Sequence, residues 1–108
     1  MKNLQLFNYN QREIRVITDE AGEPRFIAKD VCEQLELSNT SQALSKLDRD
    51  DIISNDAVDS LGRKNTFSCV NEAGLYQLVF QSRKKEAQEF KRWIAKEVIP
   101  QIRKTGTY

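Results

Sequence analysis

The chain has 108 residues, of which 39% are hydrophobic and 31% are charged, with a formal net charge of +1. This composition fits one globular domain and excludes global disorder. The chain contains no histidine. It therefore cannot by itself form a histidine-containing zinc site or a catalytic triad with histidine. No apolar run approaches the roughly 20 residues of a membrane helix, and the N-terminus lacks an apolar signal-peptide core. We therefore expect a cytoplasmic protein with no membrane contact.

Strands are predicted at 4–7 and 12–18, where β-branched residues dominate the second segment. The segment 19–22 has turn chemistry, so 24–27 should pair back as a hairpin. A helix is expected at about 29–36, and Ser38 or Asn39 should cap a second helix at about 40–47.

A charged turn at 48–51 precedes two short strands near 52–55 and 66–70, which should form a second hairpin around Gly62. Asn71 should cap a helix at about 72–81 that is apolar nearly all round and hence central and buried. Ser82 should cap a last helix from about 83 to 99 or beyond. The expected fold is α+β: one domain with small antiparallel hairpins or a sheet packed with four helices.

The net charge hides an asymmetry along the chain. Residues 1–62 carry 7 Lys/Arg and 12 Asp/Glu, whereas residues 63–108 carry 10 and 4. A split of this kind indicates that the second half faces a polyanion. Domains that bind DNA through overall charge are more basic than this, so binding would depend on a local patch.

The last predicted helix carries that patch. At ~100° per residue, Lys85, Arg92 and Lys96 fall within about 20° of one line. The opposite side carries the apolar residues Ala87, Phe90, Ile94 and Val98. A row of cations is typical of phosphate binding, and an ordinary solvated face is the alternative. Arg103 would continue the row only in a straight helix, which Pro100 opposes because it clashes with the preceding turn.

The two helices around residues 37–39 have the outline of a helix-turn-helix. Short polar side chains at the start of the second helix suit base edges or phosphates, and the candidates are Asn39, Thr40, Ser41 and Gln42. A generic helical hairpin is the alternative. Trp93 and Ile99 lie off the apolar stripe of the last helix, so they either pack within the domain or form a self-association patch.

Other chemistry is not indicated. Asp48, Asp50 and Asp51 fail the calcium-loop pattern and fit a solvated acidic turn. Cys32 and Cys69 lack CxxC spacing and fit two packed thiols rather than a disulfide. The sequence has no Gly-rich phosphate loop or catalytic constellation, so we expect neither a cofactor, a metal site nor an enzyme.

Several motifs occur in the order of one known family. They are Pro24-Arg25-Phe26-Ile27-Ala28-Lys29-Asp30-Val31-Cys32, Leu37-Ser38-Asn39, Ala43-Leu44 to Leu47-Asp48, Asn71-Glu72-Ala73-Gly74-Leu75-Tyr76, Ser82-Arg83-Lys84, Phe90-Lys91-Arg92-Trp93, Glu97-Val98-Ile99-Pro100 and Ile102-Arg103-Lys104-Thr105-Gly106. Over nearly the whole chain they resemble the N-terminal domain of the BRO family, which includes many prophage antirepressors. Lys85 stands where that family commonly has proline, and Arg25 where it commonly has tryptophan.

The resemblance implies an α+β domain that binds DNA or takes part in prophage gene control. It also implies that residues 1–108 are an N-terminal domain excised from a longer two-domain protein. Our leading hypothesis is DNA binding, with phosphates neutralised by Lys85, Arg92 and Lys96 together with Arg83, Lys84 and Arg103, and polar contacts from Asn39, Thr40 and Gln42. The alternative is a module that binds and inactivates a phage repressor, its acidic first half meeting a basic surface. A third hypothesis is a homo-oligomer.

Overall fold

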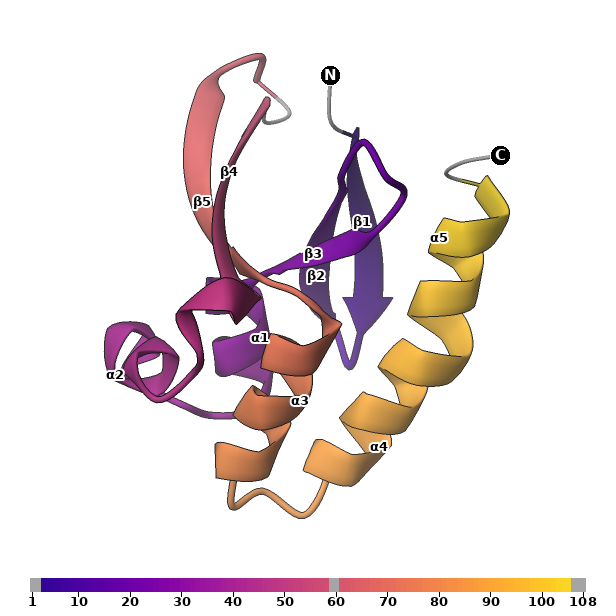
Figure 1. The fold of residues 1–108 in the computed structure, drawn as a ribbon. Helices are drawn as coiled ribbons and strands as arrows, with labels where there is room; N and C mark the ends of the chain where they lie inside the picture. Colours follow the sequence, from indigo (N-terminus) through magenta and orange to yellow (C-terminus); the bar gives the residue numbers. More distant parts are fainter. Residues whose placement is uncertain (1–2, 59–60, 106–108) are drawn as a thin grey trace.

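The computed structural model describes residues 3–58 and 61–105 and confirms the α+β class (Figure 1). Its sheet has five antiparallel strands in the order β1-β2-β3-β5-β4. The strands are β1 (Asn3–Tyr9), β2 (Arg12–Thr18), β3 (Pro24–Ile27), β4 (Ile52–Val58) and β5 (Lys64–Val70). The helices are α1 (Ala28–Gln34), α2 (Thr40–Ser45), α3 (Glu72–Gln81), α4 (Ala87–Trp93) and α5 (Ile99–Thr105). A 3₁₀ turn (Arg49–Asp51) precedes β4.

Local chemistry explains the two turns of the first three strands. Asn10 and Gln11 both have positive φ angles, as a two-residue hairpin turn requires. In the next turn the Asp19 carboxylate accepts the backbone N–H groups of Ala21 and Glu23 at 2.9 and 2.8 Å. The predicted hairpin from 12–18 to 24–27 is therefore confirmed.

Two hydrophobic clusters lie on opposite faces of the sheet. The larger one packs Ile14, Val16 and Phe26 against the helices. The smaller one, on the other face, contains Ile17, Ile27 and Cys69. Side chains alternate along a strand, so neighbouring residues of β2 and β3 supply both clusters.

The β4–β5 ribbon projects beyond α1, α2 and α3 (Figure 1). Only two residues of β3, Phe26 and Ile27, pair with β5. The chain enters α1 directly after Ile27, so β3 ends there and leaves residues 64–68 of β5 paired only with β4. Both strands of this ribbon are longer than predicted, because their outer parts pair with each other without an apolar pattern.

The predicted start of the last helix is wrong. Residues 83–86 form a loop and a turn, and α4 begins at Ala87. Ser82 does not cap α4: its hydroxyl donates to the Leu35 carbonyl at 3.0 Å. The two earlier caps are confirmed, because Asn39 accepts from the Gln42 N–H at 3.0 Å and Asn71 from the Gly74 N–H at 2.8 Å.

The helix then continues through Pro100 to Thr105. A π-helical turn (Ile94–Val98) joins α4 to α5, and the Ile99 N–H donates to the Ile94 carbonyl. This wider turn inserts a residue before the proline, which explains how the chain escapes the clash expected from a regular α-helix. Arg103 therefore lies on α5, whereas Gly106, which ends the last family motif, falls outside the described residues.

The prediction that α3 is buried nearly all round is wrong at Ala73 and Phe80, which are exposed. Leu75, Leu78 and Val79 are buried, whereas 91% of Phe80 is exposed. α3 packs against its neighbours along one side, and Phe80 lies on the side that faces solvent. Trp93 and Ile99 do pack within the domain. The ring centroids of Trp93 and Tyr9 lie 4.7 Å apart, and Ile99 is buried.

Candidate nucleic-acid interface

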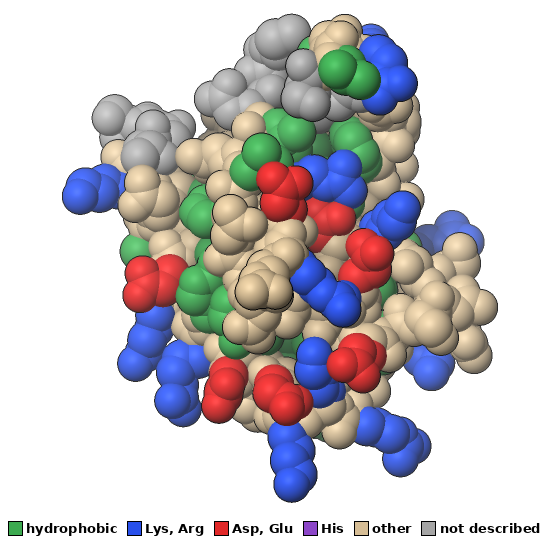
Figure 2. Space-filling model, turned by 180° about the vertical axis from the view of Figure 1, so that it is seen from behind, with side chains coloured by type: hydrophobic (Ala, Val, Ile, Leu, Met, Phe, Trp, Pro, Cys, Tyr) green, Lys and Arg blue, Asp and Glu red, His purple; other side chains and the backbone are tan. Residues whose placement is uncertain are grey.

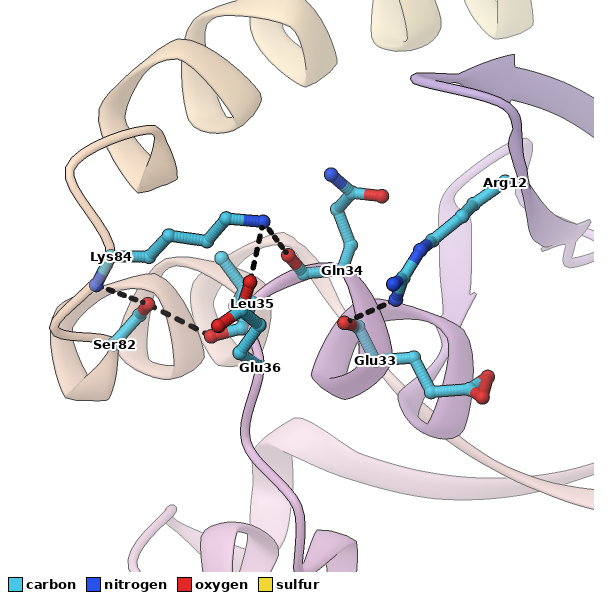
Figure 3. A network of polar contacts seen from close by, with 7 residues as sticks. All are labelled: Arg12, Glu33, Gln34, Leu35, Glu36, Ser82 and Lys84. Atoms are coloured by element: carbon cyan, nitrogen blue, oxygen red, sulfur yellow. Dashed lines mark hydrogen bonds and ion pairs between the residues drawn. The ribbon is translucent and has the colours of Figure 1, made fainter.

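Donors from other elements cap the C-terminal end of α1 (Figure 3). Arg12 Nη1 donates to the Glu33 carbonyl at 2.7 Å, and Lys84 Nζ to the Gln34 carbonyl at 3.3 Å. Lys84 Nζ also lies 3.2 Å from a Glu36 carboxylate oxygen. Unpaired carbonyls at a helix end attract cations, so Lys84, predicted to bind phosphate, is engaged within the domain.

The cations of the last helix do not form the predicted single line. Lys85 lies in the turn before α4, Arg92 on α4 and Lys96 in the π-helical turn, which changes its angle relative to Arg92. All three side chains are exposed, and no ion pair among the described residues involves them. Exposed carboxylates of Glu89 and Glu97 lie on the same helical stretch.

Carboxylates offset the positive charge of Lys and Arg over much of the surface. Figure 2 shows acidic and basic side chains interleaved over the face seen from behind. Arg83 is exposed in the loop before α4, and Arg103 is exposed on α5. Burial and a hydrogen bond to Glu72 raise the pKa of Tyr76 to about 12, and the positive charge of Arg103 offsets only part of this shift.

The three candidates at the start of α2 lie apart from these cations. In Figure 1, α2 is on one side of the molecule and α4–α5 on the other, with α1 and α3 between them. The side-chain oxygen of Asn39 accepts the hydrogen bond that caps α2, while the Gln42 side chain is exposed. Thr40 is half-buried beside Cys32 and lines a groove described next.

This groove, here called the β5 groove, has a volume of about 650 Å³ and runs between the outer edge of β5 and the starts of α1 and α2. Its three cationic residues are Arg15, Lys29 and Arg63. Polar side chains complete most of the wall: Thr40, Ser41, Asn65, Thr66 and Ser68. None of the described lining residues is Asp or Glu, so the groove is a local positive patch on a nearly neutral chain.

A buried carboxylate fixes one wall of the β5 groove. Asp30, only 7% exposed, accepts both Arg15 Nε and Nη2 at 2.8 Å, and also the Arg15 backbone N–H at 2.9 Å. The Arg15 guanidinium lies 5.1 Å from the Phe67 ring centroid, in the range of a cation–π contact. The hydrogen bonds to Asp30 raise the pKa of Arg15.

Sequence reasoning missed Arg15, Lys29 and Arg63 as site residues. They come from β2, α1 and the turn before β5, and no spacing along the chain links them. A weak signal was present in β5, where Lys64, Thr66 and Ser68 occupy alternate positions of a strand without an apolar residue among them.

The predicted acidic turn is exposed at Asp48 and Asp50, but the prediction of a solvated side chain is wrong at Asp51, which is half-buried. Asp51 accepts the side-chain amides of Asn71 and Gln77 at 3.0 and 2.9 Å, so it ties the 3₁₀ turn to α3. No group of three potential metal ligands occurs in the part of the chain that the structure describes. Cys32 and Cys69 are free and buried, which confirms two packed thiols. Over residues 3–58 and 61–105, no helix has both the length and the apolar character needed to cross a membrane.

A family model and one of two relatives name the same family. The sequence model of the BRO family, N-terminal domain, matches residues 13–100. An uncharacterized protein of Haemophilus influenzae is 37% identical over 111 residues, covering 100% of this chain and 55% of the relative. A putative Bro-N domain-containing protein, 289L, of Invertebrate iridescent virus 6 is 27% identical over 117 residues, covering 92% of this chain and 28% of the relative.

The chain thus spans about half the length of the bacterial relative and about a quarter of the viral one. No solved structure matches it. Because the family model covers most of the residues and the ordered motifs of the sequence agree with it, this chain belongs to the BRO family and comprises its N-terminal domain.

Proposed function

We propose that this domain binds duplex DNA through the β5 groove and serves phage or prophage gene regulation. The observation that carries the proposal is that Lys29 and Arg63 border a groove whose third cation, Arg15, is already paired with the buried Asp30 carboxylate. Cations neutralise DNA phosphates and release counterions, and hydroxyl and amide groups donate to phosphate oxygens. Membership of the BRO family supports a regulatory, non-catalytic role. A location in the cytoplasm of a bacterial host is part of the same proposal.

The cations of the last helix offer a second surface for the same function. Arg92 and Lys96 are exposed, as phosphate contacts would require, but Glu89 and Glu97 accompany them. Like-charged carboxylates repel phosphates, so we rank the β5 groove first. An antirepressor role, in which the protein acts on a phage repressor, is a finer form of the proposal and concerns the whole protein as much as this domain.

Charge reversal at the two surfaces tests the proposal. We expect the chain to bind a fluorescent 24-bp duplex, and Lys29→Glu with Arg63→Glu to weaken that binding about tenfold or more at low salt. Arg92→Glu with Lys96→Glu changes the net charge equally, so it is the matched control and should have the smaller effect. A wild-type chain that does not bind duplex DNA would refute the function. A larger loss from the helix pair would leave the function standing and move its surface to α4.

A further inference from the structure

The β4–β5 ribbon has one face turned to the protein and one turned to solvent. Asn55, Phe67 and Cys69 point toward the smaller hydrophobic cluster, where Asn55 is 3% exposed. The opposite face, here called the ribbon face, consists of Ser54, Asp56, Val58, Lys64, Thr66 and Ser68, all of them exposed. All of these side chains except that of Val58 carry a hydrogen-bonding group, and none of the six contributes to either cluster.

The ribbon is free to enter a groove of another molecule. β5 has no strand partner other than β4 over residues 64–68, which span about 17 Å at ~3.4 Å per residue. The major groove of B-DNA is about 12 Å wide and 8.5 Å deep, and it admits a two-stranded β-ribbon. The projecting part is therefore the kind of element that the major groove admits.

We infer that the ribbon face enters the major groove of duplex DNA and reads base edges. The inference rests on the proposed function and adds to it the element that supplies sequence preference. The hydroxyls of Ser54, Thr66 and Ser68 donate to or accept from any base, the Asp56 carboxylate accepts from cytosine N4, and the Lys64 ammonium donates to guanine O6 and N7. In a major groove Asp56 and Lys64 therefore favour particular base pairs, which phosphate contacts do not.

The chain holds the central pair of the ribbon face in a defined orientation. Asp56 and Thr66 are cross-strand partners, and Thr66 Oγ1 donates to Asp56 Oδ1 at 2.6 Å. Lys64 Nζ lies 3.8 Å from Asp56 Oδ2. A carboxylate already oriented by its neighbours loses less entropy when it accepts from a base.

The cations of the β5 groove complete the arrangement. Arg63 directly precedes β5, and Lys29 stands at the start of α1 beside the free edge of that strand. With the ribbon in the major groove, cations at its edge approach the phosphates that border the groove. This division of labour predicts that the ribbon face controls sequence preference and that the groove cations control the salt dependence.

The test is selection from a pool of duplexes with a random 20-bp core, using the full chain. We expect the wild-type chain to enrich a motif. Asp56→Ala changes a ribbon-face residue outside the β5 groove, so it should bind the unselected pool at least as tightly as wild type while losing enrichment at one or more positions. Asp56→Asn should change the preferred base at one position from cytosine to adenine, because an amide pairs with adenine N6 and N7. Gln88→Ala, an exposed change on α4, is the control and should return the wild-type motif.

Each other outcome has a definite meaning. If the ribbon variants enrich the wild-type motif, the inference is wrong and another element reads the bases. If the wild-type chain binds the pool without enriching any motif, the ribbon face is an ordinary solvated surface and the inference is again wrong. If the wild-type chain does not bind the pool at all, the proposed function itself fails.

Discussion

Arg15 and Asp30 form a two-pronged ion pair, with Nε and Nη2 of the guanidinium each 2.8 Å from a carboxylate oxygen. The pair joins β2 to α1, and the same guanidinium lies over the ring of Phe67 on β5, 5.1 Å from the ring centroid. One contact thus connects the main sheet, the first helix and the ribbon at the β5 groove. The shape of the groove depends on this pair.

Loss of the Asp30 carboxylate should therefore destabilise the whole domain. Asp30→Ala leaves the Arg15 guanidinium and backbone N–H without their acceptor, and we expect a cost of about 2–4 kcal/mol in the free energy of unfolding. Urea denaturation followed by tryptophan fluorescence measures it. Asp56→Ala removes a carboxylate from an exposed pair and should cost less than about 1 kcal/mol. Equal costs for the two variants would contradict the structural role of Asp30.

A side chain at position 74 should also be costly. A Cβ built on Gly74 lies 2.9 Å from Val70 Cβ and 3.1 Å from the Asp51 carbonyl oxygen. Gly74→Ala gains about 1 kcal/mol of helix propensity, but we expect the overlap to exceed that gain and give a net loss of about 1–3 kcal/mol. The thermal midpoint measures the change. A variant more stable than wild type would show that α3 does not approach the 3₁₀ turn so closely.

Phe80 and Leu78 should respond very differently although they lie on the same helix. Leu78→Ala empties a fully buried site and should cost about 2–5 kcal/mol. Phe80→Ser changes a side chain that is 91% exposed and should alter stability by no more than about 0.5 kcal/mol. Denaturation of both variants decides the point, since a large loss from Phe80→Ser would mean that its ring is buried in solution.

The two thiols should be inert in the native state. Cys32 and Cys69 are buried, and burial raises the pKa of the Cys32 thiol, so even less of it is thiolate at a given pH than in an exposed cysteine. We expect alkylation by iodoacetamide at pH 8 to be slow in buffer and fast for both thiols in 8 M urea, with mass spectrometry counting the adducts. Rapid labelling of Cys32 in buffer would contradict its burial.

Much of the fold could be predicted because its signals are local. The strand at 12–18 follows from β-branched residues, and the caps at Asn39 and Asn71 follow from the preference of asparagine for that position. The π-helical turn could not be predicted, because no local residue pattern in this segment specifies i→i+5 bonding. Pro100 signalled an irregularity but not its form.

The candidate site was harder to predict than the fold. The polar start of α2 was recognised, and Thr40 does line the β5 groove. Arg15, Lys29 and Arg63 became neighbours only through the pairing of β3 with β5, which no pattern in the sequence specifies. Lys84 was predicted to bind phosphate because it lies in a basic run, but in the structure it caps the C-terminal end of α1.

The measurement that tests the central claim most directly is the slope of log affinity for duplex DNA against log salt concentration. Two phosphate contacts, from Lys29 and Arg63, predict that log affinity falls with log salt at a slope of about −2, and Lys29→Glu should bring the slope about one unit closer to zero. Arg92→Glu should leave the slope nearly unchanged. A slope that Lys29→Glu does not alter would contradict phosphate binding at the β5 groove.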